Sequence, residues 1–150
     1  MRRPISATYL ARIVHMTSAA SLARAVVEGR LQIRSAGSED DLVLGPLREL
    51  AREEKVIEEE ARALAQTRGW PTNLAGTPYG WTRLGGELAR EALPRIIRIY
   101  DREVFELDAD LREHGDEEVG SLIAAALDGR RAVLRSLSLL SPQATLPGAK

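Results

Sequence analysis

The segment between residues 43 and 65 combines the spacing of an amphipathic helix with a dense run of glutamates. At 100° per residue, its apolar positions gather on one side of a helix. These positions are Val43, Leu47, Leu50, Ile57, Ala61, Leu64 and Ala65. Five glutamates lie between Glu53 and Glu60 in the same segment. The pattern therefore predicts a helix with one buried face, and each glutamate has to be placed on or off that face.

Length and composition favour a single all-α domain. The chain has 150 residues and is 44% apolar, which is enough for one hydrophobic core. Aromatic residues make up only 4%, whereas β-sandwiches need many aromatic and β-branched positions. Leu, Ala, Arg and Glu are abundant, as they are in long helices. We therefore expect residues 1–150 to form one helical domain.

Capping residues and helix breakers divide the chain into four predicted helices. Their ranges are about 6–34, 40–69, 84–114 and 116–140. Residues 69–86 contain five glycines and two prolines, and they predict one long connection. The other links are short, which places the helices in two antiparallel hairpins and predicts a four-helix bundle with a long crossing. Pro94 either kinks the third helix or begins a new segment, and we expect the tail at 141–150 to be disordered.

Only two of the five glutamates are predicted to face the core of the bundle. The other three fall at the border of the apolar face or outside it, where water solvates them. Glu54 and Glu58 fall in line with Leu47 and Ala65, one turn apart. A carboxylate removed from water costs several kcal/mol unless it meets a cation, a proton or a metal ion. Each inward glutamate therefore needs a partner elsewhere in the chain.

The predicted helix at 116–140 offers such a partner in Arg130. Its apolar stripe contains no acidic residue, but Arg130 falls in the middle of the stripe. Arginine pairs well with carboxylates because its planar guanidinium donates hydrogen bonds in a fork. We therefore predict an inward ion-pair cluster of Glu54, Glu58 and Arg130, which accounts for the inward glutamates without any ligand.

The predicted helix at 84–114 carries polar residues along one flank of its apolar stripe. Glu103, Asp110 and His114 occupy this flank. They point either inward or towards the rim of the bundle, and their position at the edge of the stripe favours the rim. Glu103 is therefore a further candidate for the ion-pair cluster and not a core member of it.

Two helical hairpins, inward carboxylates at mid-height and a long crossing together resemble the ferritin-like superfamily, in particular its small bacterial members. The resemblance covers residues 6–140. Metal-binding members of this superfamily use a Glu from each of two helices and a Glu-x-x-His from each of the other two. The resemblance implies that Glu54 and Glu103 match the glutamates of the Glu-x-x-His motifs, and that Glu28 matches the ligand of the first helix.

The chain departs from that ligand pattern in three places. Ile57 and Glu106 stand where the two histidines are expected. Arg130 stands where the last helix would supply a ligand, and a fixed cation opposes metal binding. No catalytic or cofactor-binding residue is assigned, and a di-metal oxidase or ferroxidase is disfavoured. A carboxylate site for iron or manganese stays open as an alternative. Its candidate ligands are Glu54, Glu58, Glu103 and Glu28.

Two groups of residues are candidate surfaces. Trp70, Tyr79 and Trp81 cluster around the long connection, and they predict either a lid over one end of the bundle or a surface for a partner or a small molecule. The predicted helix at 6–34 also carries a second, weaker apolar strip. Its members are Ala11, His15, Ala19, Leu22 and Val26. This strip favours a packed, hydrogen-bonded His15 and also predicts self-association into a homo-oligomer.

Charge and composition argue against several functional classes. The chain has 21 basic and 22 acidic residues and a net charge of −1, so it has no overall field that would attract nucleic acid or a membrane surface. It has no cysteine, which fits a reducing compartment, and we expect it in the cytoplasm. We expect a non-enzymatic bacterial bundle that acts through protein association. The alternatives are a metal-binding carboxylate protein in metal or oxidative-stress handling, and a helical small-molecule sensor.

Overall fold

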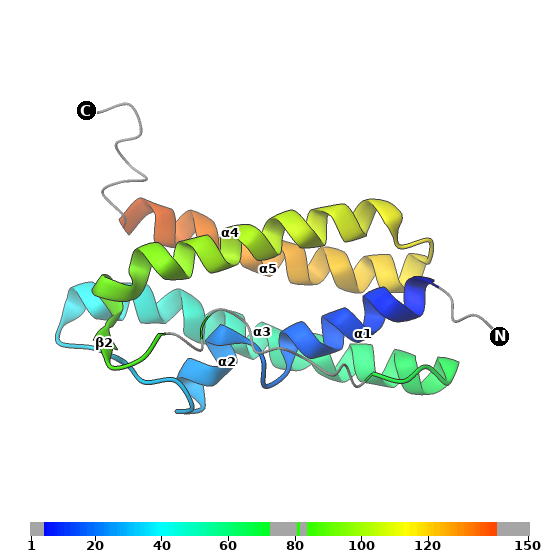
Figure 1. Cartoon of the computed structure of the whole chain (residues 1–150), viewed down its shortest axis with the longest axis horizontal. Helices are drawn as coiled ribbons and strands as arrows, with labels where there is room; N and C mark the ends of the chain where they lie inside the picture. Colours follow the sequence, from blue (N-terminus) through cyan, green and yellow to red (C-terminus); the bar gives the residue numbers. More distant parts are fainter. Residues whose placement is uncertain (1–4, 73–80, 82–83, 141–150) are drawn as a thin grey trace.

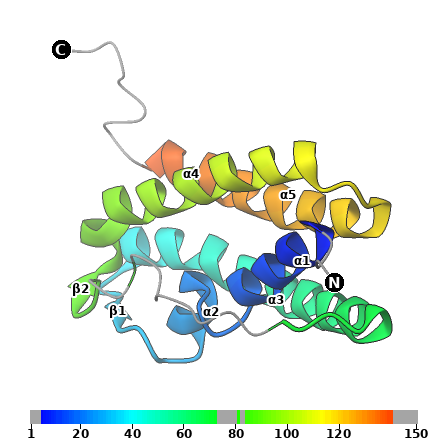
Figure 2. The same ribbon diagram turned by 45° about the vertical axis from the view of Figure 1, so that its right-hand side comes forward.

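The computed structural model describes residues 5–72, 81 and 84–140, and most of these are helical. Four long helices run along the length of the molecule: α1 (Ile5–Thr17), α3 (Ser38–Arg68), α4 (Ala89–Glu113) and α5 (Glu117–Leu140) (Figure 1). The short helix α2 (Leu22–Val27) lies beside α3 (Figure 2). The prediction of an all-α fold is therefore confirmed. None of the described helices is both long and apolar enough to cross a membrane.

Helix α5 holds a central position in the packing. It contacts α4, α3 and α1, while α3 also packs against α1, α2 and α4. The apolar spacing of each helix explains this arrangement, because each one buries a continuous stripe against its neighbours. Gly69 and Gly115 follow α3 and α4 and both have a φ of 69°, a left-handed conformation that ends a helix and favours glycine.

The prediction of one helix over 6–34 is wrong, because the chain breaks after Thr17. The Thr17 hydroxyl donates to the Ile13 carbonyl at 2.7 Å, and the Ser18 hydroxyl donates to the His15 carbonyl at 2.7 Å. Ser21 then caps α2, since its side-chain oxygen accepts from the Arg24 amide at 3.2 Å. Hydroxyl side chains compete in this way with helical backbone hydrogen bonds. A cluster of them at residues 17–21 was the sequence signal for the break.

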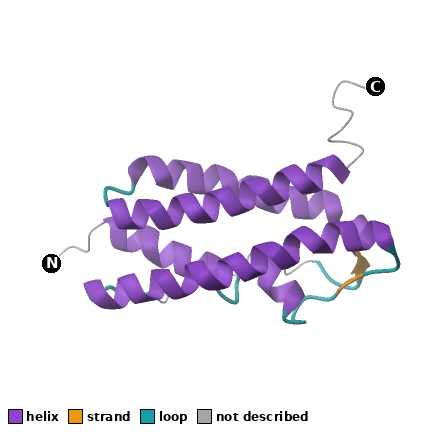
Figure 3. Ribbon diagram, turned by 180° about the vertical axis from the view of Figure 1, so that it is seen from behind, coloured by secondary structure: helices purple, strands orange, loops and turns teal. Residues whose placement is uncertain are grey.

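Two short strands replace predicted helical residues at one end of the molecule. Strands β1 (Ile33–Arg34) and β2 (Glu87–Leu88) pair in parallel, and Figure 3 shows them beside the end of the helices. The Gly86 amide donates to the Gln32 carbonyl at 2.7 Å next to this pair. Helix α4 therefore begins at Ala89 and not near residue 84 as predicted, and it continues through Pro94 without a break in the helix.

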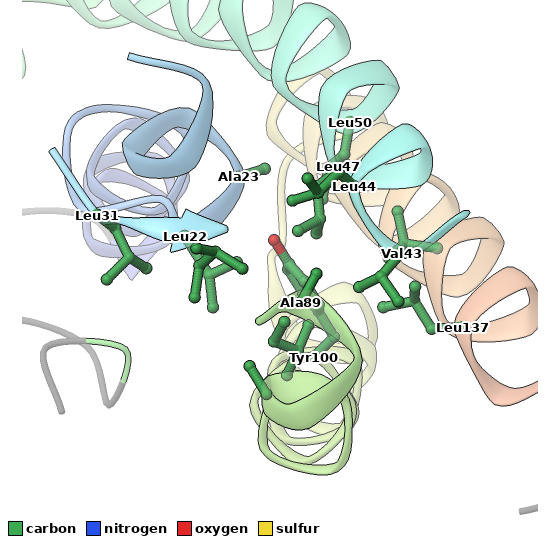
Figure 4. Packing of buried hydrophobic residues seen from close by; sticks show 14 of the residues in the cluster. Leu22, Ala23, Leu31, Val43, Leu44, Leu47, Leu50, Ala89, Tyr100 and Leu137 are labelled. Atoms are coloured by element: carbon green, nitrogen blue, oxygen red, sulfur yellow. The ribbon is translucent and has the colours of Figure 1, made fainter. Parts of the chain in front are cut away.

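The hydrophobic core consists of two clusters that meet near the middle of the long helices. One cluster contains Leu50, Tyr100 and Val133, and the other contains Ile57, Leu107 and Ala126. Figure 4 shows the first cluster, with residues of α2, α3, α4 and α5 directed towards Tyr100. On α3, α4 and α5 the boundary between the two clusters falls at buried charged residues. These residues form the candidate site described below.

Asp40 links the beginnings of α3 and α4. Its fully buried carboxylate accepts from the Ala36 amide at 2.7 Å and from the Arg90 amide at 2.9 Å. It lies inside the first turn of α3, whose N-cap is Gly37, although the sequence predicts Asp40 or Asp41 as the cap. The two amide hydrogen bonds lower the pKa of Asp40, because they favour its charged form.

We expect Asp40→Asn to destabilise the protein at neutral pH and to have less effect in acid. The folded-state pKa of Asp40 lies below its ordinary value of 3.8. Its contribution to stability is therefore present above that pH and is lost as the pH falls through the folded-state pKa. Urea denaturation of both proteins over a pH series measures this difference. Asp41→Asn is the control, since Asp41 is exposed, and an equal effect of both substitutions would contradict the role of Asp40.

Candidate functional site

A buried guanidinium lies between two carboxylates at mid-height of the bundle. Arg130 on α5 is only 1% exposed. Its Nη2 atom lies 2.5 Å from Glu54 Oε2 on α3, and its Nε atom lies 2.6 Å from Glu103 Oε1 on α4. Nη2 also donates to the Met16 carbonyl on α1 at 3.4 Å. One side chain therefore contacts all four long helices. We call Glu54, Glu103 and Arg130 the buried ion cluster.

Ser21 completes the surroundings of Glu54. Its hydroxyl donates to Glu54 Oε1, while its oxygen also caps α2. Burial raises the pKa of Glu54, and the charge of Arg130 and the hydrogen bond from Ser21 oppose that rise. The nearby Glu103 carboxylate adds to it. Two acidic groups thus share one guanidinium, and burial makes Glu54 hold its proton more tightly in the folded state than an exposed glutamate does.

The buried carboxylates keep Arg130 charged. Burial alone would lower the pKa of Arg130, but Glu54 and Glu103 outweigh this effect and raise the pKa. A paired guanidinium can remain in a dry core because hydrogen bonds replace the water that it loses. The cluster therefore contains its own fixed cation between its two acidic groups.

Tyr100 lies beside the buried ion cluster with a polar atom that lacks a normal partner. Its side chain is fully buried, and no described side chain hydrogen-bonds to its hydroxyl, although the Ala23 backbone lies close enough to lower its pKa. Figure 4 shows this oxygen directed between Ala23 and Leu47. Burial raises the pKa of Tyr100 well above its ordinary value, and the Glu54 and Glu103 carboxylates add to the rise. The phenol therefore stays protonated and neutral beside the cluster.

The structure corrects the expected pairing of Glu58 with Arg130. Glu58 Oε1 lies 2.8 Å from Arg24 Nη1, and Glu58 Oε2 lies 2.9 Å from Arg62 Nε. Arg24 also donates to the Thr17 carbonyl at 2.8 Å. Glu58 points towards α2, which exists as a separate helix only because the chain breaks after Thr17. The pairing of Glu58 with Arg24 could not be predicted without predicting the break after Thr17.

The expected metal ligands do not come together as a set. Glu28 lies at the end of α2, where it pairs with Arg24 at 2.9 Å and with Arg30 at 2.6 Å, so it does not reach the core. Glu54 and Glu103 both contact Arg130. Within residues 5–72, 81 and 84–140, no group of three Asp, Glu or His side chains could hold a metal ion.

The polar flank of α4 lies deeper than the sequence indicates. Glu103 and Asp110 are buried, and the favoured position at the rim is therefore wrong for both. Asp110 pairs with Arg12 on α1 at 2.6 Å, and the His114 carbonyl accepts from Ser6 at 2.6 Å. Arg12 lies near the apolar stripe of α1, so its side chain can reach Asp110 on α4. The depth of these acidic groups depends on how α1 and α5 cover them, which periodicity on a single helix cannot show.

The two described tryptophans pack against different parts of the core. Trp70 packs on the cluster that contains Leu107, and the Arg68 guanidinium lies 5.1 Å from the centre of its ring. Trp81 packs on the cluster that contains Leu50 and donates to the Ala20 carbonyl at 2.6 Å. Tyr79 lies outside the described residues. Both tryptophans therefore secure chain segments, and they do not form one aromatic surface with each other.

The apolar strip predicted for self-association is not an open surface. Ala11 and Leu22 are buried within the chain, and His15 and Val26 are partly buried. The break after Thr17 places α2 in a new helical phase, so residues from the two helices no longer share one face. Ala19 is the exposed member of the strip, and self-association through this part of the chain stays a prediction.

Comparisons with protein-family models, with curated protein sequences and with solved structures find no match for this chain. The resemblance to the ferritin-like superfamily therefore stays a prediction from architecture and pattern. Any function has to be argued from the geometry of the core and of the outer faces.

We expect Arg130→Met to destabilise the protein by roughly 3–5 kcal/mol, because it leaves two buried carboxylates without a cation. Adding Glu54→Gln and Glu103→Gln to the same chain should recover part of this loss, since no stranded charge remains. Urea denaturation monitored by circular dichroism measures both effects. Arg131→Met changes the neighbouring, exposed arginine and serves as the control. An unchanged stability in Arg130→Met would contradict the pairing.

We expect Glu54→Gln to become more favourable relative to the wild type as the pH rises. The folded-state pKa of Glu54 is raised above 4.5, so its stabilising contribution is present below that pH and is lost as the pH rises through the folded-state pKa. Glutamine resembles the protonated form and does not titrate. Denaturation of both proteins from below pH 4.5 to neutral pH tests this, with Glu53→Gln on the same helix as the exposed control. A constant difference across the series would contradict the raised pKa.

Proposed function

We propose that this chain is a metal-free helical bundle of the ferritin-like type that acts through protein contacts on its outer faces. The observation that carries this proposal is the position of Arg130. Its guanidinium occupies the space between Glu54 and Glu103, at 2.5 and 2.6 Å from them. A fixed cation in this place competes with any metal ion that needs the same oxygen atoms. The polar centre of the core is thereby filled from within the chain.

The arrangement of the helices supports the ferritin-like part of the proposal. Four long helices surround the buried ion cluster, and a long connection, residues 69–88, separates α3 from α4. Bundles of this superfamily place inward carboxylates on facing helices at mid-height. Here the same places hold an acidic pair and an arginine. We therefore propose a member whose ligand positions have become an internal ion cluster.

The outer faces support the association part of the proposal. Among the described residues, six large apolar side chains are more than half exposed: Ile5, Val27, Leu42, Val56, Phe105 and Leu139. They are spread over all five helices, and single exposed apolar residues are ordinary. Phe105 and Leu139, each 76% exposed, offer the most apolar surface to a partner. The core offers no comparable opportunity for chemistry. A non-enzymatic role in protein assembly follows, and the lack of cysteine supports a reducing compartment such as the cytoplasm.

One observation favours metal binding as the alternative function. Glu54 and Glu103 come from different helices and converge on one point in the core, and hard carboxylate ligands suit iron and manganese. This alternative requires Arg130 to leave its place. It also requires the remaining ligands to come from Ser21 or Tyr100, which are weaker ligands than carboxylates while they stay protonated.

Elemental analysis of the purified, untagged protein tests the proposal, followed by thermal denaturation with added Fe(II), Mn(II) and Zn(II). We expect no stoichiometric metal and no change in Tm for the wild type. The Arg130→Ala variant is the matched comparison, because it leaves two carboxylates without a cation, and its Tm should rise with metal. One or two metal ions per wild-type chain, lost in Glu54→Ala, would overturn the proposal in favour of the alternative.

A further inference from the structure

The outer face of α4 presents an exposed aromatic residue among arginines. Phe105 is 76% exposed and is the only phenylalanine of the chain. Arg98 and Arg102 lie seven and three residues before it, which places all three on one side of the helix. Both arginines are exposed. Arg102 Nε lies 3.7 Å from Glu106 Oε2 on the same helix, whereas Arg98 forms an ion pair with none of the described residues. We call Arg98, Arg102 and Phe105 the α4 stripe, with Asp101 at its edge.

The outer face of α3 presents the opposite charge with a similar apolar residue. Glu49, Glu53 and Val56 lie on one side of α3, and Val56 is 54% exposed. Glu60 extends this side by one more turn. Neither Glu53 nor Glu60 pairs with a described residue, whereas Glu49 is 3.9 Å from Arg52. We call Glu49, Glu53, Val56 and Glu60 the α3 stripe.

Two separate hollows lie beside the α3 stripe, between α3 and α5. The lining of one includes Glu49, Glu53, Gly129 and Ala132, and the lining of the other includes Glu60, Ala63 and Ser121. On the α5 side the small residues Gly129, Ala132 and Ser121 alternate with larger ones, among them Val133, Glu118 and Leu122. On the α3 side the three glutamates lie beside Leu50, Leu64 and Arg68. Small side chains let another helix approach closely, so these hollows leave space for side chains of a helix that packs along α3.

The two stripes share one spacing and carry opposite charges. Arg98, Arg102 and Phe105 follow the pattern i, i+4 and i+7, and Glu49, Glu53 and Val56 follow the same pattern. Two helix faces with this match can place a carboxylate against each arginine and an aliphatic side chain against the phenylalanine. Both stripes are exposed on the same chain, so they cannot satisfy each other within it.

We propose that the α4 stripe of one copy docks on the α3 stripe of a second copy, beside the hollows between α3 and α5. This inference rests on the proposed function and names its partner. The contact joins two different surfaces, so the pair keeps one free α4 stripe and one free α3 stripe and can bind further copies. Exposed ion pairs are individually weak and are screened by salt. The association is therefore salt-dependent, with Phe105 supplying its apolar contact.

Charge reversal with complementation tests this contact. One variant carries Arg98→Glu and Arg102→Glu, and a second carries Glu53→Arg and Glu60→Arg. Each variant alone brings like charges together and should weaken association at low salt by about tenfold or more. An equimolar mixture pairs each reversed stripe with an opposite charge and should restore association. Sedimentation velocity over a range of concentrations measures this, and circular dichroism checks that each variant is folded.

The control carries Arg48→Glu and Lys55→Glu, which reverse two exposed charges on another side of α3, and it should associate as the wild type does. Two outcomes would overturn the inference. Reversed variants that associate like the wild type would exclude these stripes and leave association itself intact. A wild-type chain that stays monomeric at low salt would exclude a second copy as the partner. Neither outcome bears on the metal content of the core, which the preceding experiment tests separately.

Discussion

The interaction on which the rest of the structure depends is the contact of Arg130 with Glu54 and Glu103. Its guanidinium reaches α3, α4 and the Met16 carbonyl of α1 from α5, and Ser21 joins α2 to the same cluster. Apolar contacts tolerate small sliding movements of one helix along another, but a buried charge has to meet its partner at one height. The cluster therefore sets the register of the helices around two otherwise ordinary apolar clusters.

The parts of this arrangement that could be predicted follow from one rule of helix geometry. Glu54 and Arg130 lie in the middle of apolar stripes, so a regular helix carries them into the core, where each needs the other. This reasoning requires only that α3 and α5 are regular helices through these residues, and they are. The long stripes of α3, α4 and α5 also made their approximate bounds and the all-α class predictable.

The parts that could not be predicted depend on contacts between elements. The break after Thr17 is decided by hydroxyl hydrogen bonds that compete with the helix, and it redirects Glu58 towards Arg24. The depth of Glu103 depends on how closely α4 approaches α5. It carries the same weak signal as His114 on the flank of its stripe, yet only Glu103 reaches Arg130. Periodicity along one helix indicates which side chains point towards the core, but the packing of neighbouring helices determines how deeply each side chain is buried.

The glutamates of α3 separate into two groups with different consequences for function. Those that point inward are neutralised within the chain: Glu54 by Arg130 and Glu58 by Arg24 and Arg62. Glu53 and Glu60 point outward without an ion pair to a described residue, each beside a hollow between α3 and α5. The inward glutamates are balanced by arginines of the same chain, whereas the charges of Glu53 and Glu60 are available for contact with another molecule. The density of glutamates on one helix thus reflects two separate demands, a stable interior and a charged outer face for a partner.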